Sequence, residues 1–253
     1  MSILIITSSL DTNEKDQNGV RIPHNFGNQN GILDTLKSSI KKYDNFLFVA
    51  SSETGYEHTD MYFNVTKTSF NLTLPFKNYH VLDGRTKDNA RQLINDADFI
   101  FLCGGHVPTQ NTFFNKINLK ELLKKYNGVI CGGSAGSMNC AGTVYCPPEL
   151  DGESVDPKFK RFIKGLGLTN INVYPHFQDE RNIILDGKRN LEDIIIPDSY
   201  KTKIIAINDG TYIVKKENVE TIYGQAYEIY NGVMKKICDD GSSLVLWKND
   251  FII

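Results

Sequence analysis

The chain has 253 residues, 40% of them hydrophobic and 23% charged, which is ordinary for a globular protein with a substantial core. Its formal net charge is -2, and no basic stripe with interleaved aromatic residues appears, so the composition argues against a nucleic-acid partner. No apolar run approaches the roughly 20 residues of a membrane span, and we expect no membrane partner.

The first residues and the cysteines indicate the cellular compartment. Residues 1–7 lack the basic start and long apolar stretch of a secretory signal, and they are typical of a buried strand. The five cysteines are odd in number and show no C-x-x-C spacing, which argues against a zinc site or a disulfide framework. Cys103 and Cys131 lie in apolar runs typical of buried thiols. A reducing, cytoplasmic location fits this cysteine usage best.

The first two thirds of the chain alternate short apolar runs with helical patterns. The apolar runs predict strands at 3–7, 46–50, 79–82, 99–103 and 129–131. We expect the intervening helices at 31–43, within 56–72, at 87–96 and at 119–126. This alternation predicts a mostly parallel sheet with helices on both faces.

The last third changes character. Short β runs from 204 to 246 are separated by turn sequences such as Asn231-Gly232 and Asp240-Gly241, which predict an antiparallel meander. No linker, repeat or low-complexity segment interrupts the chain. We therefore expect a single α/β domain over 1–253, with a β-rich part over about 204–253.

The most informative motif is Gly132-x-Ser134-x-Gly136, which follows the apolar run at 129–131. It has the pattern of a nucleophile elbow, a strained strand-to-helix turn that exposes a serine hydroxyl. A plain glycine-rich turn or a phosphate-binding loop is the alternative. No Gly-Lys-Ser/Thr follows, which excludes a Walker loop, and the match to a dinucleotide fingerprint is poor.

Two of the predicted strands end in glycine pairs, at 104–105 and 132–133. Ligands bind beyond the carboxyl ends of parallel strands, so these two loops are expected to face one site. The backbone N–H groups of Gly105 and Ala135 then become oxyanion donors.

A serine nucleophile needs a base, and the five histidines offer two candidates near strand ends. His176 follows a strand-like run and a proline, whereas His106 directly follows the glycine pair and is expected to line the pocket. The acid that orients the base is either Asp209, in a turn after an apolar run, or Glu153, in an acidic loop; the pattern alone does not separate them. The order Ser134, His176, Asp209 does not fit an α/β-hydrolase.

Together these segments carry a family resemblance. They are Gly104-Gly105, Asn111-Thr112-Phe113, the residues 132–137, Pro175-His176-Phe177 and Asp209-Gly210. Over roughly 80–215 the chain resembles the serine peptidase family of dipeptidase E (aspartyl dipeptidase) and cyanophycinase. That resemblance implies a flavodoxin-like fold similar to class I glutamine amidotransferases, with serine in place of cysteine.

The resemblance also implies a Ser-His-acid triad with its acid in an acid-Gly turn, which favours Asp209 over Glu153, although the family usually has glutamate there. Residues 106–110 separate the glycine pair from Asn111, where the family runs without interruption. Tyr174 stands where the family has aspartate, so specificity for N-terminal aspartate or a cyanophycin-like polymer does not carry over.

We therefore predict a serine peptidase or hydrolase that cleaves a small peptide or amide through an acyl-enzyme at Ser134, with no metal or organic cofactor. The residues expected to bind substrate are His106, Asn111, Tyr174 and Arg181, the last through a substrate carboxylate. Two alternatives remain open: a non-catalytic small-molecule-binding protein on the same fold, and an amidase or esterase acting on a non-peptide metabolite. The segment 56–72 is rich in aromatic residues that could form a dimer face, so a homodimer stays open as an alternative.

Overall fold

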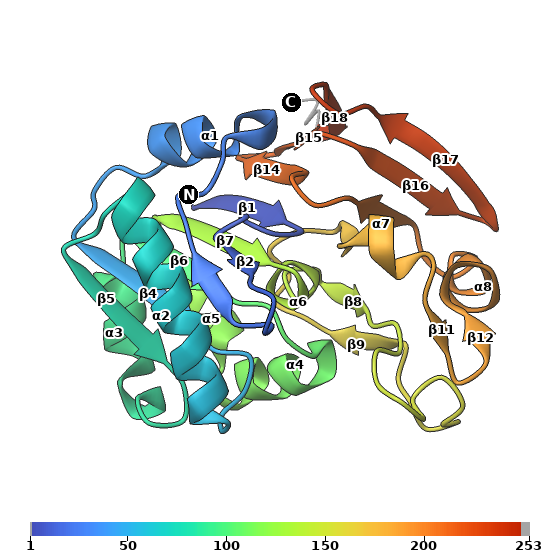
Figure 1. Cartoon of the computed structure of the whole chain (residues 1–253), viewed down its shortest axis with the longest axis horizontal. Coiled ribbons are helices and arrows are strands. Elements are labelled where there is room, and N and C mark those ends of the chain that lie inside the picture. The colour runs from blue at the N-terminus through green and yellow to red at the C-terminus, as the bar shows by residue number, and fades with distance from the viewer. Residues whose placement is uncertain (1, 249–253) are drawn as a thin grey trace.

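The computed structural model describes residues 2–248, and its main element is an eight-stranded sheet of order β18-β15-β14-β1-β7-β6-β4-β5 (Figure 1). Strands β1, β7, β6, β4 and β5 are mutually parallel, which confirms the predicted parallel sheet. Their bounds are Ile3–Thr7 (β1), Asn45–Val49 (β4), Asn78–Leu82 (β5), Phe99–Leu102 (β6) and Val129–Gly133 (β7). Three antiparallel strands extend the sheet beyond β1: β14 (Tyr212–Lys216), β15 (Val219–Tyr223) and β18 (Ser243–Lys248).

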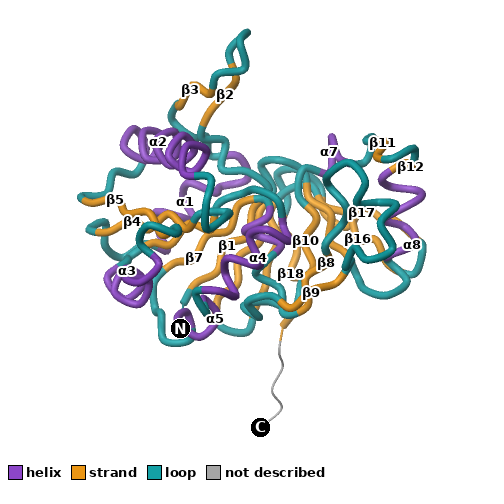
Figure 2. Tube along the Cα trace, turned by 90° about the horizontal axis from the view of Figure 1, so that it is seen from below, coloured by secondary structure: helices purple, strands orange, loops and turns teal. Residues whose placement is uncertain are grey.

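Helices cover both faces of the sheet, because successive strand residues point to opposite sides. Phe46 and Phe48 of β4 pack in one apolar cluster with helices α1 (Ile32–Ser39) and α2 (Tyr56–Thr73). Leu47 and Val49 pack in the other cluster with α3 (Ala90–Asp96), α4 (Val107–Lys116) and α5 (Leu119–Leu123). Figure 2 shows the strands between α2 on one side and α3 and α5 on the other.

A second sheet lies beside the first and has the order β10-β13-β16-β17. Its strands are β10 (Asn172–Tyr174), β13 (Ile204–Ile207), β16 (Ala226–Tyr230) and β17 (Val233–Cys238). The antiparallel C-terminal strands are thus present as predicted, but they are divided between two sheets instead of forming one meander. The turn at 208–210 carries the chain from β13 to β14 in the other sheet. All four residues of β13 are buried, so this strand takes a neighbour on each side, β10 and β16.

Shorter elements complete the described chain. They are β2 (Asn13–Lys15), β3 (Arg21–Pro23), α6 (Ala135–Met138), β8 (Thr143–Tyr145), β9 (Phe162–Lys164), α7 (Phe177–Glu180), β11 (Ile184–Leu185), β12 (Lys188–Arg189), a π-helical turn (Asn190–Ile195), α8 (Ile196–Asp198) and 3-10 turns at Gln29–Gly31 and Lys87–Asn89. The β2–β3 hairpin projects from the body of the molecule (Figure 2).

Two composition-based expectations can be compared with this fold. Cys103 and Cys131 are buried and unpaired, as expected for core thiols. Across residues 2–248, no helix has both the length and the apolar character that crossing a bilayer requires. The single domain over 1–253 stays a prediction, and residues 1 and 249–253 of it lie outside the described residues.

Candidate active site

Two pairs of parallel strands bring the predicted catalytic residues to one region. Strands β1 and β7 are neighbours with Thr7 opposite Gly133, so Ser8 and Ser134 follow at the same edge. Strands β10 and β13 are parallel neighbours in the small sheet, and the segments that follow them carry His176 and Asp209. The site therefore lies beyond the carboxyl ends of strands in both sheets.

Ser134 has the geometry of a nucleophile elbow. Its backbone angles, φ 50 and ψ -120, lie in a strained region for a residue with a side chain. Its N–H donates to the carbonyl oxygens of Thr7 and Ser8, both at 3.1 Å, which ties the turn to the end of β1. Ser134 is partly exposed between fully buried stretches, and its hydroxyl makes no hydrogen bond within the described residues and does not cap α6. The hydroxyl is therefore available to a ligand.

The turn closes only because Gly136 has no side chain. A Cβ at this position would lie 2.1 Å from the carbonyl oxygen of Leu102 and 2.8 Å from that of Cys103. Both obstacles are backbone atoms of the neighbouring strand and loop, so neither can rotate away as a flexible side chain would.

We expect Gly136→Ala to destabilise the protein because the added methyl group must push β6 and α6 apart. Overpacking of this kind costs about 1–3 kcal/mol of unfolding free energy, and urea denaturation measures it. Gly142→Ala is the matched control, since a Cβ there meets its nearest neighbour at 3.9 Å, an ordinary contact. Equal stability of the two variants would contradict the close packing of the elbow.

His176 and Asp209 form a hydrogen-bonded pair, with 2.8 Å between the imidazole Nδ1 and the carboxylate Oδ1. Gln178 holds the same carboxylate from the other side: its Nε2 donates to Asp209 Oδ2 at 2.9 Å, and its Oε1 accepts from the Asp209 N–H at 3.0 Å. His176 itself has a left-handed backbone with φ 53. No hydrogen bond joins the imidazole to the Ser134 hydroxyl among residues 2–248, but both residues line the same two cavities.

Ser8 is a residue of this site that the sequence analysis missed. Its hydroxyl donates to Asp209 Oδ1, lies 3.2 Å from His176 Nδ1, and accepts the His176 backbone N–H at 2.7 Å. This one side chain thus links the end of β1 to both residues of the pair. Its position directly after a predicted strand was the available signal.

The electrostatics of the pair suit a general base. Burial opposes protonation of His176, but the adjacent Asp209 carboxylate, with Glu180 and Asp179 nearby, outweighs it and raises the pKa of the imidazole. Burial would likewise raise the pKa of Asp209, yet hydrogen bonds from His176, Ser8 and Gln178 lower it. Asp209 therefore stays ionised when His176 gains a proton.

Glu153, the alternative acid, lies against a different histidine. Its Oε1 is 2.9 Å from His106 Nε2, and its Oε2 accepts the backbone N–H groups of Glu149 and Leu150. The other ring nitrogen of His106 is 2.8 Å from the Thr109 hydroxyl. The structure brings Asp209, and not Glu153, to His176.

The proposed oxyanion donors also lie beside Ser134. A Cβ on Gly104 would lie 3.2 Å from the Ser134 Cβ, so the loop after β6 touches the elbow. Gly105 has φ +149 and so little space beside Ser51 that a Cβ would lie 2.5 Å from its Cβ, so only glycine fits there. Ala135 is the first residue of α6, so its N–H has no acceptor within the helix.

A cavity of about 320 Å³ opens beside Ser134 and contains several of the residues expected to bind substrate. Gly105, His106 and Tyr174 line it, together with Ser134 and His176. A second cavity, of about 240 Å³, shares Ser134 and His176 and extends toward Ser8 and the β2–β3 hairpin. Ser134 thus lies where the two cavities meet.

Two predicted substrate-binding residues lie elsewhere. Asn111 is buried in α4, where its amide donates to Asn139 Oδ1 and to the Lys164 carbonyl, both at 2.9 Å. Arg181 stacks on the ring of Phe177, with 5.3 Å between its guanidinium carbon and the ring centre. Neither residue lines either cavity at Ser134.

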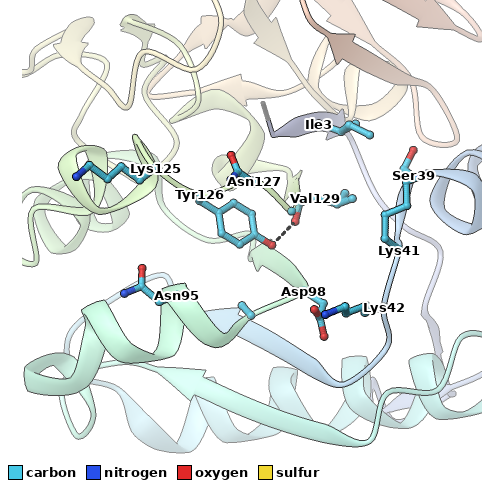
Figure 3. Close-up of a pocket in the computed structure, with 12 residues that line it drawn as sticks. Ile3, Ser39, Lys41, Lys42, Asn95, Asp98, Lys125, Tyr126, Asn127 and Val129 are labelled. Carbon is cyan, nitrogen blue, oxygen red and sulfur yellow. Dashed lines mark hydrogen bonds between the residues drawn. The ribbon is translucent and has the colours of Figure 1, made fainter.

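A larger cavity, of about 430 Å³, lies away from Ser134 at the opposite edge of the main sheet (Figure 3). It is bordered by Ile3 and Val129, the first residues of β1 and β7, and Figure 3 shows Tyr126 donating to the Val129 carbonyl at 3.3 Å. The charged residues that line it are Lys41, Lys42, Lys125 and Asp98. Within residues 2–248 no cluster of three or more His, Cys, Asp or Glu side chains is placed to hold a metal ion.

Known structures share this fold. A peptidase from an acI-B1 Actinobacterium superimposes with a TM-score of 0.66 over 97% of this chain and 97% of its own, at 17% sequence identity. A putative peptidase E protein from Listeria monocytogenes EGD-e superimposes with a TM-score of 0.57 over 94% of this chain and 99% of its own, at 14% identity. No curated protein sequence matches the chain. Residues 23–222, which are most of the chain, match the model of peptidase family S51. This match supports a peptidase. The chain belongs to peptidase family S51.

Proposed function

We propose that the protein is a serine peptidase that cleaves a small peptide or amide through an acyl-enzyme at Ser134. The observation that carries the proposal is the shared cavity: Ser134, on a strained elbow with an unbonded hydroxyl, lines it together with His176, whose Nδ1 contacts Asp209. Membership of peptidase family S51 supports a peptidase over a protein that only binds a ligand.

In the proposed reaction His176 removes the Ser134 proton as the serine oxygen bonds to the scissile carbonyl carbon. Because Nδ1 is held by Asp209, the transfer falls to Nε2. The N–H groups of Gly105 and Ala135 stabilise the oxyanion, and losing one such donor typically costs about 3 kcal/mol of transition-state stabilisation. The proton then passes to the leaving amine as the C–N bond breaks, and water hydrolyses the resulting ester.

A fluorophosphonate probe tests this proposal. The serine oxygen displaces fluoride from phosphorus, so an activated Ser134 becomes covalently labelled, and peptide mapping by mass spectrometry identifies the modified residue. We expect labelling at Ser134 in the native protein and none after unfolding. Native protein that stays unlabelled would favour the binding-protein alternative, whereas labelled protein that hydrolyses simple esters but no dipeptide would favour a non-peptide substrate.

A further inference from the structure

The cavity of about 320 Å³ beside Ser134 is acidic. Glu149 and Glu180 line it, and the described residues of its lining include no lysine or arginine. Its two histidines are already engaged, His176 with Asp209 and His106 with Glu153. Among the described residues, neither glutamate is therefore paired with a lysine or arginine of the cavity wall.

A buried amide adds an unused acceptor to the same cavity. Asn190 is 3% exposed, and its Nδ2 donates to the Glu180 carbonyl oxygen and to the Tyr174 hydroxyl, both at 2.8 Å. Because the Glu180 carbonyl oxygen can only accept a hydrogen bond, the side-chain atom of Asn190 that faces it must be the nitrogen. The Asn190 Oδ1 is then buried without a partner among the described residues. An unsatisfied buried acceptor is costly, and a donor on a bound ligand would satisfy it.

The carboxyl groups of Glu149 and Glu180 both have raised pKa values, so the protein disfavours their ionised forms. Loss of hydration beside the surrounding protein, together with repulsion from Glu180 and Glu153, raises the pKa of Glu149 to about 8, so without a bound cation this carboxyl group is mostly protonated at neutral pH. Burial also raises the pKa of Glu180, whose Oε2 accepts from Tyr174 at 3.2 Å. A cation bound between these groups would relieve the repulsion.

The cavity on the other side of Ser134 has the opposite polarity. Arg21 and His58 line it, and within residues 2–248 its lining includes no aspartate or glutamate. The Arg21 guanidinium donates to Asn13 Oδ1 and to the Tyr62 hydroxyl, both at 2.8 Å and both neutral groups. A short peptide has its ammonium on the acyl side of the scissile bond and its carboxylate on the leaving side. This difference in polarity would orient the peptide with its acyl residue toward Glu149 and Glu180.

Resting on the peptidase function proposed above, we propose that the acidic cavity binds a cationic side chain of the acyl residue, an ammonium or guanidinium group, and rejects an aspartyl side chain. Glu149 and Glu180 supply carboxyl acceptors for its N–H groups, and Asn190, whose buried Oδ1 has no partner among the described residues, lines the same cavity. An aspartate in the same place would add a third carboxylate to the cavity and would leave the Asn190 oxygen unpaired.

A matched set of peptides tests the proposal: Lys-Leu, norleucine-Leu and Asp-Leu, together with the N-acetylated forms of the first two. If the side chain is the cation, Lys-Leu exceeds norleucine-Leu at least tenfold in kcat/KM, and acetylation preserves the difference. If the two free peptides react alike and acetylation of norleucine-Leu lowers kcat/KM at least tenfold, only the α-ammonium is recognised and the proposal is overturned. Asp-Leu as the best substrate, or acetyl-norleucine-Leu reacting as fast as Lys-Leu, would overturn the proposal.

Glu149→Gln provides the second arm. It should reduce the advantage of the cationic peptide at least threefold, while Glu192→Gln, the same substitution at an exposed position away from the cavity, leaves that advantage unchanged. An advantage that survives Glu149→Gln in full counts against the assignment. Labelling of wild-type Ser134 by a neutral fluorophosphonate separates the two ideas: labelled protein without a cation preference refutes only this inference, and unlabelled native protein refutes the peptidase itself.

Discussion

Ser134→Ala should lower kcat/KM by about 10^6-fold, to the residual rate that substrate binding and the oxyanion donors alone provide. The hydroxyl is the only group that the change removes, and it makes no hydrogen bond among the described residues, so the fold has little reason to respond. We therefore expect an unchanged urea midpoint, complete loss of fluorophosphonate labelling and loss of peptide turnover. Ser38→Ala, at an exposed position in α1, is the control for both readouts.

Ser134→Gly sharpens this test. Glycine adopts φ 50, ψ -120 without the penalty that a side chain incurs, and such strain is worth about 1–3 kcal/mol. The glycine variant should therefore be inactive and also more stable than wild type. A less stable glycine variant would mean that the elbow is not strained, and measurable turnover in either variant would remove Ser134 from the mechanism.

Asp209→Asn should lower kcat by about 10^4-fold with little change in stability. The amide can present its N–H to His176 Nδ1, which would place the ring proton on Nε2 and leave no basic nitrogen for the serine. Asp209→Glu keeps the charge and should retain far more activity than the asparagine variant. Similar losses in both variants would show that the carboxylate charge has no role.

The pH profile gives an independent readout of this pair. His176 acts as a base only when neutral, so activity rises with pH through the pKa of the imidazole, which lies above its ordinary value of 6.5 because Asp209 favours the protonated form despite burial. Removing the charge in Asp209→Asn leaves burial as the larger influence, which lowers this pKa. The acidic limb of kcat/KM should therefore move to lower pH in Asp209→Asn; an unmoved limb would assign it to another group.

The sequence predicted the secondary structure most accurately where the local pattern of apolar residues matches their burial in the folded protein. Strand β1 begins at Ile3 and ends at Thr7 as predicted, because the parallel strands are buried on both faces and appear as continuous apolar runs. Helix α4 was not predicted: its residues Val107–Lys116 include a proline and four Asn, Gln or Thr residues before Phe113, and its apolar face becomes recognisable only against the core. The division of the C-terminal strands between two sheets depends on long-range pairing that turn sequences do not encode.

The candidate site shows the same limit. The glycines around Ser134 and the proline before His176 are local signals, and the structure places both residues at one cavity. Ser8 and Gln178 contact Asp209 from 201 and 31 residues away along the chain, and no spacing rule connects them. Glu180 is likewise remote from Glu149 in sequence, so the acidity of the cavity emerges only when α7 is folded beside the loop that carries Glu149.

Because the candidate site is divided between two sheets, the proposed catalysis would depend on how the two sheets pack against each other. Ser134 follows a strand of the large sheet, whereas His176 and Asp209 follow strands of the small sheet. The Ser8 hydroxyl links the two sheets, because it accepts from the His176 N–H and donates to Asp209 Oδ1. Each half can keep its own backbone pairing while a shift of about 1 Å between them costs on the order of 100-fold in rate. Loosening the contact between the two sheets would therefore abolish the proposed activity before either sheet unfolded.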